Sequence, residues 1–260
     1  MSLLPIIELL SPNTDERPAA TPIDMLVLHY TGMASSKAAL DRLRDPQAKV
    51  SAHYMVEETG AIFRLAPEQA RAWHAGVSNW KGRDNLNGRS IGIEIVNGGH
   101  DFGCPAYPAV QMEAVAALSR EIMARHPIRA DNVVAHSDIA PTRKQDPGEW
   151  FDWRFLHARG VGLWAEPEPI LEDGPALSLH DRGDPVAELQ YGLASYGYGL
   201  EVLGRFDEQT RAVIAAFQRH FRPERVDGIA DLSTVMTLKK LIEAQSRVQA
   251  AASPTSRPGV

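Results

Sequence analysis

The chain has 260 residues, of which 44% are hydrophobic and 23% are charged. This length allows one large domain or two smaller ones, and the composition is that of a globular protein with a sizeable core. The formal net charge of -6 argues against a nucleic-acid partner, because a phosphate backbone requires a basic protein face.

Short apolar runs predict the strands of a central sheet. The run over 91–97 alternates, so Ile91, Ile93 and Ile95 share one face and Glu94 points to the other. A hairpin is predicted where Glu58-Thr59-Gly60 separates two segments of strand character. The predicted strands cover residues 25–30, 51–57, 61–65, 91–97 and 132–136.

Two helical segments lie among these strands. Ser35 can cap a helix that ends near Asp45, just before Pro46. A second helix is predicted over 110–125, where apolar residues recur at helical spacing before His126-Pro127. Because hairpin pairing accompanies crossover helices, we expect an α/β fold in which helices flank a mixed central β-sheet.

The composition changes near residue 165. Proline and acidic residues over 166–175 predict a stiff, solvated linker. Three helical patterns follow, over 185–196, 208–221 and 232–245, and Asp207 and Asp231 can cap the second and third. The predicted organisation is a first domain over 1–165, a linker over 166–175, a small all-α three-helix domain over 176–247 and a disordered tail over 248–260.

Two histidines, His29 and His136, stand at the ends of predicted buried strands. A lone histidine in such a place is more often a structural, hydrogen-bonded residue, but strand ends of one sheet can converge on a cleft. Asp146 lies in a loop that can return beside His136. Two histidines and one aspartate suit a catalytic zinc ion, which keeps its fourth position for water. The alternative for Asp146 is a turn residue, since Asp-Pro-Gly is a turn signal.

Five motifs in the first domain resemble those of the zinc N-acetylmuramoyl-L-alanine amidases, which share a fold with the peptidoglycan recognition proteins. The resemblance covers roughly residues 20–160, and it rests on His29-Tyr30-Thr31, Ser51-Ala-His-Tyr-Met-Val56, Ala72-Trp-His-Ala-Gly76, Ser90-Ile-Gly-Ile-Glu-Ile-Val-Asn97 and Val134-Ala-His-Ser-Asp-Ile-Ala-Pro-Thr-Arg-Lys-Gln-Asp-Pro-Gly148.

That resemblance implies hydrolysis of the amide between N-acetylmuramic acid, or its 1,6-anhydro form, and the L-alanine of peptidoglycan or muropeptides. It implies one zinc ion per chain, held by His29, His136 and Asp146. Glu94 matches the catalytic acid/base, and Lys144 matches a lysine that can stabilise an oxyanion. Without the resemblance, Glu94 reads as a solvated strand residue and Lys144 as an exposed loop lysine. The candidates for contact with the substrate are Tyr54, His74, Arg89 and Asn97.

The helical region resembles the three-helix peptidoglycan-binding module of wall hydrolases, over about residues 175–245. The elements that carry this resemblance include Leu189-Gln190, Ala216-Phe-Gln218 and Val226-Asp-Gly228. A generic helical bundle is the alternative, because the apolar residues alone would form any such core. The charged loop Arg222-Pro-Glu-Arg225 departs from the module's pattern.

Two other functions on related architectures stay open. One is a non-catalytic peptidoglycan-sensing protein, although such proteins lose a metal ligand. The other is a zinc peptidoglycan peptidase, although its relatives use a His-x-His pair that this chain lacks. In each case the partner is peptidoglycan or a muropeptide, and we expect a monomer.

The remaining predictions concern Cys104 and the cellular compartment. A single cysteine excludes an internal disulfide, and we expect Cys104 to be a small buried residue. No apolar run approaches the roughly 20 residues that span a bilayer. Pro5 and Glu8 interrupt the apolar start, and no basic residue precedes it, so a secretory signal is not predicted. We therefore expect a cytoplasmic protein. The alternative is a periplasmic or wall-associated location, reached after a leader is cleaved or by another route of export.

Overall fold

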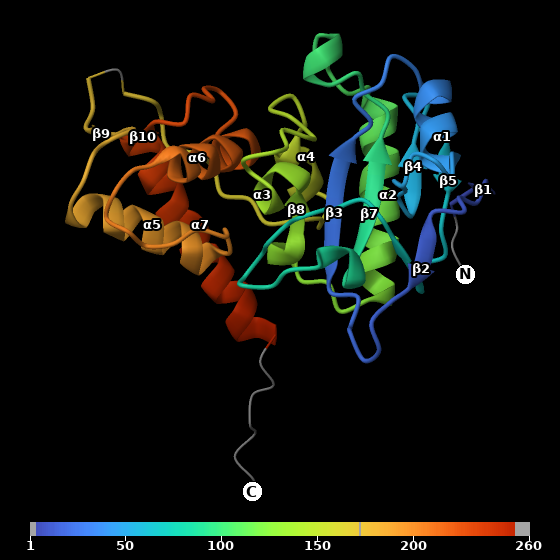
Figure 1. The fold of residues 1–260 in the computed structure, drawn as a ribbon. Helices are drawn as coiled ribbons and strands as arrows, with labels where there is room; N and C mark the ends of the chain where they lie inside the picture. The colour runs from blue at the N-terminus through green and yellow to red at the C-terminus, as the bar shows by residue number, and fades with distance from the viewer. Residues whose placement is uncertain (1–3, 172, 253–260) are drawn as a thin grey trace, which may run out of the picture.

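The computed structural model describes residues 4–171 and 173–252. Its centre is a mixed six-stranded sheet in the order β1-β5-β4-β7-β3-β8 (Figure 1). The hairpin partners β4 and β5 are antiparallel, and the other neighbours are parallel, which confirms the predicted mixed sheet. The strands are β1 (Ile6–Glu8), β3 (Met25–Tyr30), β4 (Tyr54–Val56), β5 (Ile62–Arg64), β7 (Ser90–Ile95) and β8 (Val133–Ala135).

The prediction missed three short strands near the edge of the sheet. They are β1 and the antiparallel pair β2 (Thr14–Glu16) and β6 (Ala70–Ala72). Each strand has only three residues, and no residue of β1 or β2 is buried. Backbone pairing with distant segments holds them in place, so they lack the apolar pattern by which a strand is recognised in a sequence.

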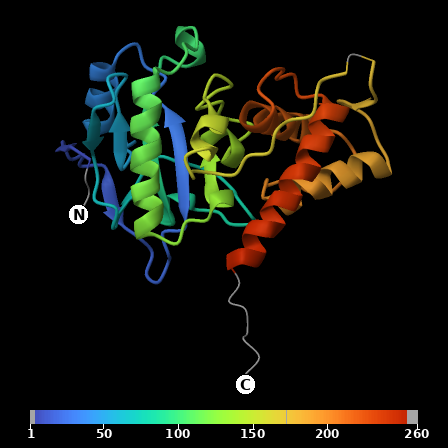
Figure 2. The same cartoon turned by 180° about the vertical axis from the view of Figure 1, so that it is seen from behind.

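Helices cover both faces of the sheet. Helix α2 (Ala109–Arg125) lies across one face (Figure 2), where Val115 and Ile122 pack against Leu28 and Ile93. Helix α1 (Ser36–Arg44) packs on the other face, with Leu43 in the same cluster as Met55 and Val96. The predicted cap is confirmed, since the side chain of Ser35 accepts a hydrogen bond from the N–H of Ala38.

Short helices connect these elements. Helix α3 begins at His136, so the prediction of a strand through His136 was one residue too long. The chain turns there because the carboxylate of Asp138 accepts a hydrogen bond from the N–H of Ala135 at 2.8 Å. The short helices are η1 (Leu86–Gly88), η2 (His100–Phe102), η3 (Ala130–Asn132), α3 (His136–Ile139) and α4 (Trp153–His157).

The C-terminal part consists of three helices and a two-stranded sheet. Asp207 and Asp231 cap the second and third helices as predicted, through the N–H groups of Thr210 and Thr234. The elements are β9 (Ala176–Leu177), α5 (Asp184–Tyr196), α6 (Glu208–Phe221), β10 (Ala230–Asp231) and α7 (Leu232–Ala252). Helix α7 continues to Ala252, so the predicted disordered tail is helical over 248–252, and its remainder, 253–260, lies outside the described residues.

The helical region packs directly against the sheet region beside β8 (Figure 1). One apolar cluster contains Val134 and Ile139 from the sheet side together with Leu193, Tyr198 and Phe217 from the helical side. Burial of such side chains contributes about 1.5–3 kcal/mol each. The two regions therefore share a core, although the sequence predicts a linker between them.

Within residues 4–171 and 173–252, no helix combines the length and the apolar character needed to cross a membrane.

Candidate active site

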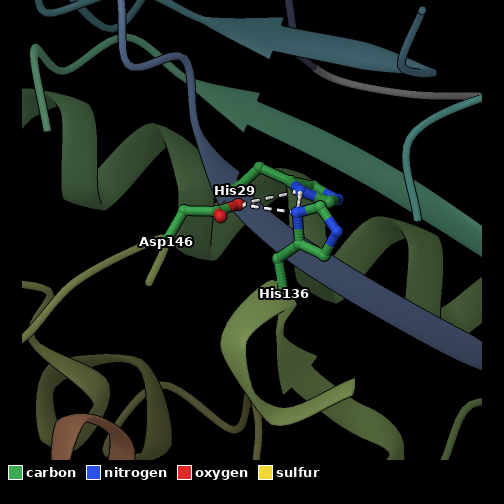
Figure 3. A group of neighbouring side chains, drawn as sticks. All are labelled: His29, His136 and Asp146. Carbon is green, nitrogen blue, oxygen red and sulfur yellow. Dashed lines mark hydrogen bonds and ion pairs between the residues drawn. The ribbon is translucent and has the colours of Figure 1, made fainter. Parts of the chain in front are cut away.

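Three side chains from distant parts of the chain meet at the carboxyl end of the central sheet (Figure 3). His29 lies on β3, His136 begins α3, and Asp146 lies in the loop after α3. The two imidazole Nδ1 atoms are 2.9 Å apart, and each is 3.0 Å from Oδ2 of Asp146. The loop returns to this place because the N–H of Ser137 donates to the backbone carbonyl of Asp146 at 3.0 Å. The structure thus brings together the three predicted metal ligands.

The hydrogen bonds on the far side of each ring decide which nitrogen carries the proton. The hydroxyl of Ser90 donates to Leu86 O, so it accepts from Nε2–H of His74. Nδ1 of His74 is then free to accept from Nε2–H of His29, at 3.0 Å. Nε2–H of His136 donates to Ala75 O at 3.1 Å. In the neutral rings, both Nδ1 lone pairs therefore point at the carboxylate oxygen.

Three lone pairs at such short separations repel one another unless a cation lies between them. His29, His136 and Asp146 each offer one potential ligand atom, and these three atoms lie within 4.8 Å of one another, as expected of a group that can hold a metal ion. Two neutral imidazoles and one carboxylate are also a donor set found in metal centres. The residues present therefore fit a metal ion.

Burial and mutual charge set the protonation of this cluster. Burial, and then the neighbouring ring of His136, lower the pKa of His29 to about 4. Burial alone would raise the pKa of Asp146, but His136 and His29 outweigh it and hold that pKa well below its usual range. At neutral pH the cluster therefore offers an unprotonated ring nitrogen and a carboxylate, as a metal ion requires.

Gly92 lets His74 lie directly behind His29. A β-carbon at Gly92 would come within 2.5 Å of Cγ of His74. Only glycine therefore leaves room for the ring in the middle of β7, between Ile91 and Ile93. The motif Ile-Gly-Ile-Glu thus supports the ring that orients His29.

A pocket of about 190 Å³ opens on the cluster, and both predicted catalytic residues, Glu94 and Lys144, line it. Glu94 lies beside His29 in the β3–β7 register. Its Oε2 is buried and has no hydrogen-bond partner among the described residues. Burial, and then the charge of Asp146, raise the pKa of Glu94 well above its usual value, whereas Lys144 opposes the rise. An unpaired carboxylate oxygen beside the cluster is available to a water molecule or a substrate.

Tyr54 points to the opposite face of the sheet, away from the pocket. In the register, Tyr54 pairs with Ile93, whereas Glu94 pairs with Met55 and His29. Because successive residues of a strand face opposite sides, Tyr54 faces α2. Its hydroxyl donates to Glu68 at 2.7 Å. Tyr54, which the family resemblance predicts as a substrate contact, therefore does not line this pocket.

The other three predicted substrate contacts also have structural partners. His74 lines the pocket, but its ring is hydrogen-bonded to His29 and Ser90, so its role is to orient the ring of His29. Arg89 lies outside the pocket and forms an ion pair with Asp24. Asn97 uses its side-chain amide on the backbone of Gly99 and Pro105. Arg89 and Asn97 thus stabilise loops and do not line the described pocket.

The prediction missed several residues of the pocket wall. Tyr30 and Trp73 line the pocket and belong to the motifs that were recognised, so a signal for them existed. Arg42 reaches the pocket from α1, and nothing in the sequence distinguishes it from other surface arginines. Cys104, predicted as a small buried residue, is buried with 9% of its surface exposed.

Comparison with known families assigns both halves of the chain. Residues 19–149 match the family described as N-acetylmuramoyl-L-alanine amidase, and residues 182–238 match the one described as putative peptidoglycan binding domain. The N-acetylmuramoyl-L-alanine amidase AmiD of Escherichia coli K12 is 40% identical over 239 residues, which are 86% of this chain and 84% of that protein.

A second relative and a solved structure extend this likeness. The 1,6-anhydro-N-acetylmuramyl-L-alanine amidase AmpD of Salmonella typhimurium SL1344 is 38% identical over 165 residues, covering 57% of this chain and 86% of that protein. The structure of E. coli AmiD with the substrate anhydro-N-acetylmuramic acid-L-Ala-D-gamma-Glu-L-Lys matches with a TM-score of 0.73 at 38% identity. That match covers 88% of this chain and 92% of the solved one, so it includes sheet and helices alike.

Proposed function

Because the chain belongs to the N-acetylmuramoyl-L-alanine amidase family, we propose that it hydrolyses the amide between N-acetylmuramic acid, or its 1,6-anhydro form, and L-alanine. The observation that carries this proposal is the convergence of His29, His136 and Asp146 at 2.9–3.0 Å beside a pocket that Glu94 and Lys144 also line. The named relatives act in this chemistry, and the binding-domain match over 182–238 fits a peptidoglycan substrate.

Zinc is the metal that we assign to the three ligands. His29, His136 and Asp146 offer two nitrogens and one oxygen, a set that leaves a fourth position open on a four-coordinate ion. When bound, the zinc ion supplies a water nucleophile at neutral pH and polarises the substrate carbonyl.

Glu94 is placed to carry the proton in this reaction. Its unpaired Oε2 can accept a proton from the attacking water and donate it to the amine of L-alanine as that group leaves. Burial raises the pKa of Glu94. A raised pKa makes the ionised carboxylate a stronger base toward the attacking water.

Lys144 lines the same pocket, two residues before the ligand Asp146. Its ammonium group can stabilise negative charge that develops on the carbonyl oxygen. His74 acts one step further away, because it fixes the ring of His29 through a 3.0 Å hydrogen bond.

The proposal keeps two further predictions that rest on the sequence alone. One is a monomer, and the other is a cytoplasmic location, with a periplasmic or wall-associated location as the alternative.

Product analysis tests the proposed function. The full chain, loaded with zinc, is incubated with anhydro-N-acetylmuramoyl-tripeptide, and the products are identified by mass spectrometry. We expect a tripeptide with a free L-alanine amine, loss of turnover with a chelator, and recovery when zinc is added back. Asp146→Ala should abolish turnover and lower the zinc content from about one ion per chain, because one of the three ligands is gone.

Cleavage at any other bond would assign a peptidase or glycosidase instead. Full turnover by Asp146→Ala at wild-type zinc content would remove the assigned metal site.

A further inference from the structure

One short segment of the chain holds the outer nitrogens of both histidine ligands. The second ring nitrogens of His29 and His136 point away from Asp146 (Figure 3). His74 accepts the proton of the first ring at 3.0 Å, and the backbone carbonyl of Ala75 accepts the proton of the second ring at 3.1 Å. Because these two acceptors are neighbours in the chain, one shift of this backbone would disturb both ligand rings.

Different parts of the molecule fix the two sides of that segment. On one side, the side-chain oxygen of Asn87 accepts hydrogen bonds from the N–H groups of His74 and Ala75, at 3.1 and 2.7 Å. On the other side, Nη2 of Arg143 donates to the carbonyl of Ala75 at 3.2 Å and also to the carbonyl of Val77. Arg143 lies three residues before the third ligand, so the ligand loop itself holds the segment.

A sharp turn brings these two carbonyls to one guanidinium group. Gly76 has a φ of +58°, in the left-handed region that favours glycine. The side chain of Val77 is 86% exposed, so its packing contributes little to the turn. Hydrogen bonds to the backbone carbonyls therefore hold the turn in place, and those from Arg143 are charge-assisted.

The carbonyl of Ala75 accepts from two side chains at once, Arg143 and His136. A carbonyl oxygen has two lone pairs, so both hydrogen bonds can form together. The bond from the charged guanidinium group is the stronger of the two. Arg143 therefore fixes the place of this oxygen, and the oxygen orients the ring of His136.

We propose that Arg143 is a positioning residue of the metal site, which orients His136 through the carbonyl of Ala75. The proposal rests on the metal ion proposed above, because the orientation matters for the nitrogen that faces the ion. Lys144, the next residue, lines the active-site pocket, whereas Arg143 does not line it. The two neighbouring cations thus have separate roles, one toward the substrate and one toward a ligand.

The first test measures the zinc affinity of the full chain by competition with a chelating indicator. Arg143→Met keeps the length of this exposed side chain and removes its donors. We expect the affinity to fall about tenfold, the lower end of the loss usual for an outer partner of a metal-bound histidine. Arg143→Lys should recover part of it, because lysine restores a charged donor without the planar fork.

The matched control for these variants is Arg211→Met. Arg211 lines the same surface hollow as Arg143, and it bonds the carboxylate of Glu208 instead of a backbone carbonyl. We expect this variant to bind zinc with wild-type affinity.

The second test uses metal-free protein that carries isotope-labelled histidine. Nitrogen NMR shifts of His136 report which of its two ring nitrogens carries the proton. In the wild type we expect the proton on Nε2, where Ala75 O accepts it, and in Arg143→Met a mixture of the two tautomers. A merely structural role of Arg143 would lower stability and leave this ratio unchanged.

Each outcome decides the proposal. Wild-type zinc affinity together with an unchanged tautomer in Arg143→Met would overturn it. A raised KM for the muropeptide at unchanged zinc affinity would overturn it as well, since Arg143 would then contact the substrate. A wild-type chain that binds no zinc would refute the metal site, whereas a changed tautomer in metal-free Arg143→Met would still support the positioning role.

Discussion

Buried polar side chains occur in both regions of the molecule, but they are bonded in different ways. In the helical region, Gln190 donates to Arg205 O and to Thr210 Oγ1, and it accepts from the N–H groups of Leu203 and Gly204. Gln218 repeats this arrangement with the loop before α7, whose backbone it both donates to and accepts from. In the sheet region, the buried rings of His29 and His136 instead turn unprotonated nitrogens toward a carboxylate.

This difference distinguishes buried polar groups that stabilise the fold from buried polar groups that can bind a ligand. A buried amide that uses all its donors and acceptors fixes the loops around it and leaves nothing for a ligand. A cluster of lone pairs, next to the unpaired Oε2 of Glu94, is stable only when something from outside completes it. Within the described chain, the sheet region therefore offers a donor set that fits a metal ion, whereas the two glutamines hold the loops of the helical domain in place.

The largest expected effect comes from Glu94, the sheet residue whose oxygen lacks a partner. Glu94→Gln keeps the shape of the side chain but cannot accept and return a proton. We expect kcat to fall by about 10²- to 10⁴-fold, the usual contribution of a general acid/base. Zinc content should stay at the wild-type level, because Glu94 does not belong to the ligand cluster.

Steady-state turnover of the muropeptide and metal analysis of the same sample measure both quantities. Near-normal kcat in Glu94→Gln would remove the acid/base role. Loss of zinc would show that Glu94 belongs to the metal site instead.

The sequence was sufficient to predict that His29 and His136 lie close together. His29 and His136 follow apolar runs that must be strands, and parallel strands present their carboxyl ends at one edge. The face of Tyr54 could not be read in the same way, since β4 is buried on both sides and Met55 and Val56 are both apolar. Without alternation of polar and apolar residues, nothing in the sequence says which face a side chain occupies.

The contacts between the sheet region and the helical region could not be predicted from the sequence either. A proline-rich acidic segment predicts a linker, and it carries no information about whether the domains touch. The structure shows Tyr198 and His220 of the helical region bonded to Asp138, two residues after His136. Such a contact depends on side chains 60 and 82 residues away from Asp138, and no local pattern encodes it.

A smaller effect is expected at His74, the residue that orients His29. His74→Leu removes the acceptor of Nε2–H of His29, so the proton is no longer fixed on the far side of the ring. We expect zinc affinity to fall about 10- to 100-fold, as is usual when the partner of a metal-bound histidine is lost. Competition with a chelating indicator measures it. His74→Gln, which restores a carbonyl acceptor, should recover part of the affinity.

Gln218→Leu is the contrasting variant in the helical region. It breaks the satisfied network of the helical region, so we expect a loss of stability of about 1–3 kcal/mol in urea unfolding while zinc affinity stays unchanged. Should His74→Leu lower stability and leave zinc affinity intact, the division between the two kinds of buried polar group would not hold.

The smallest effect is expected at Tyr198, where the two regions meet. Its hydroxyl donates to Oδ1 of Asp138 at 2.7 Å, and Asp138 in turn caps the helix that begins with His136. Tyr198→Phe keeps the ring and removes one of several bonds to Asp138, because His220 still donates to Oδ2 at 2.6 Å. We expect a loss of stability of about 1 kcal/mol and a weakening of zinc affinity of at most a few-fold. Tyr196→Phe is the matched control, since Tyr196 is equally buried and does not bond Asp138. Equal zinc affinities in the two variants would show that the helical domain supports the fold without reaching the metal site.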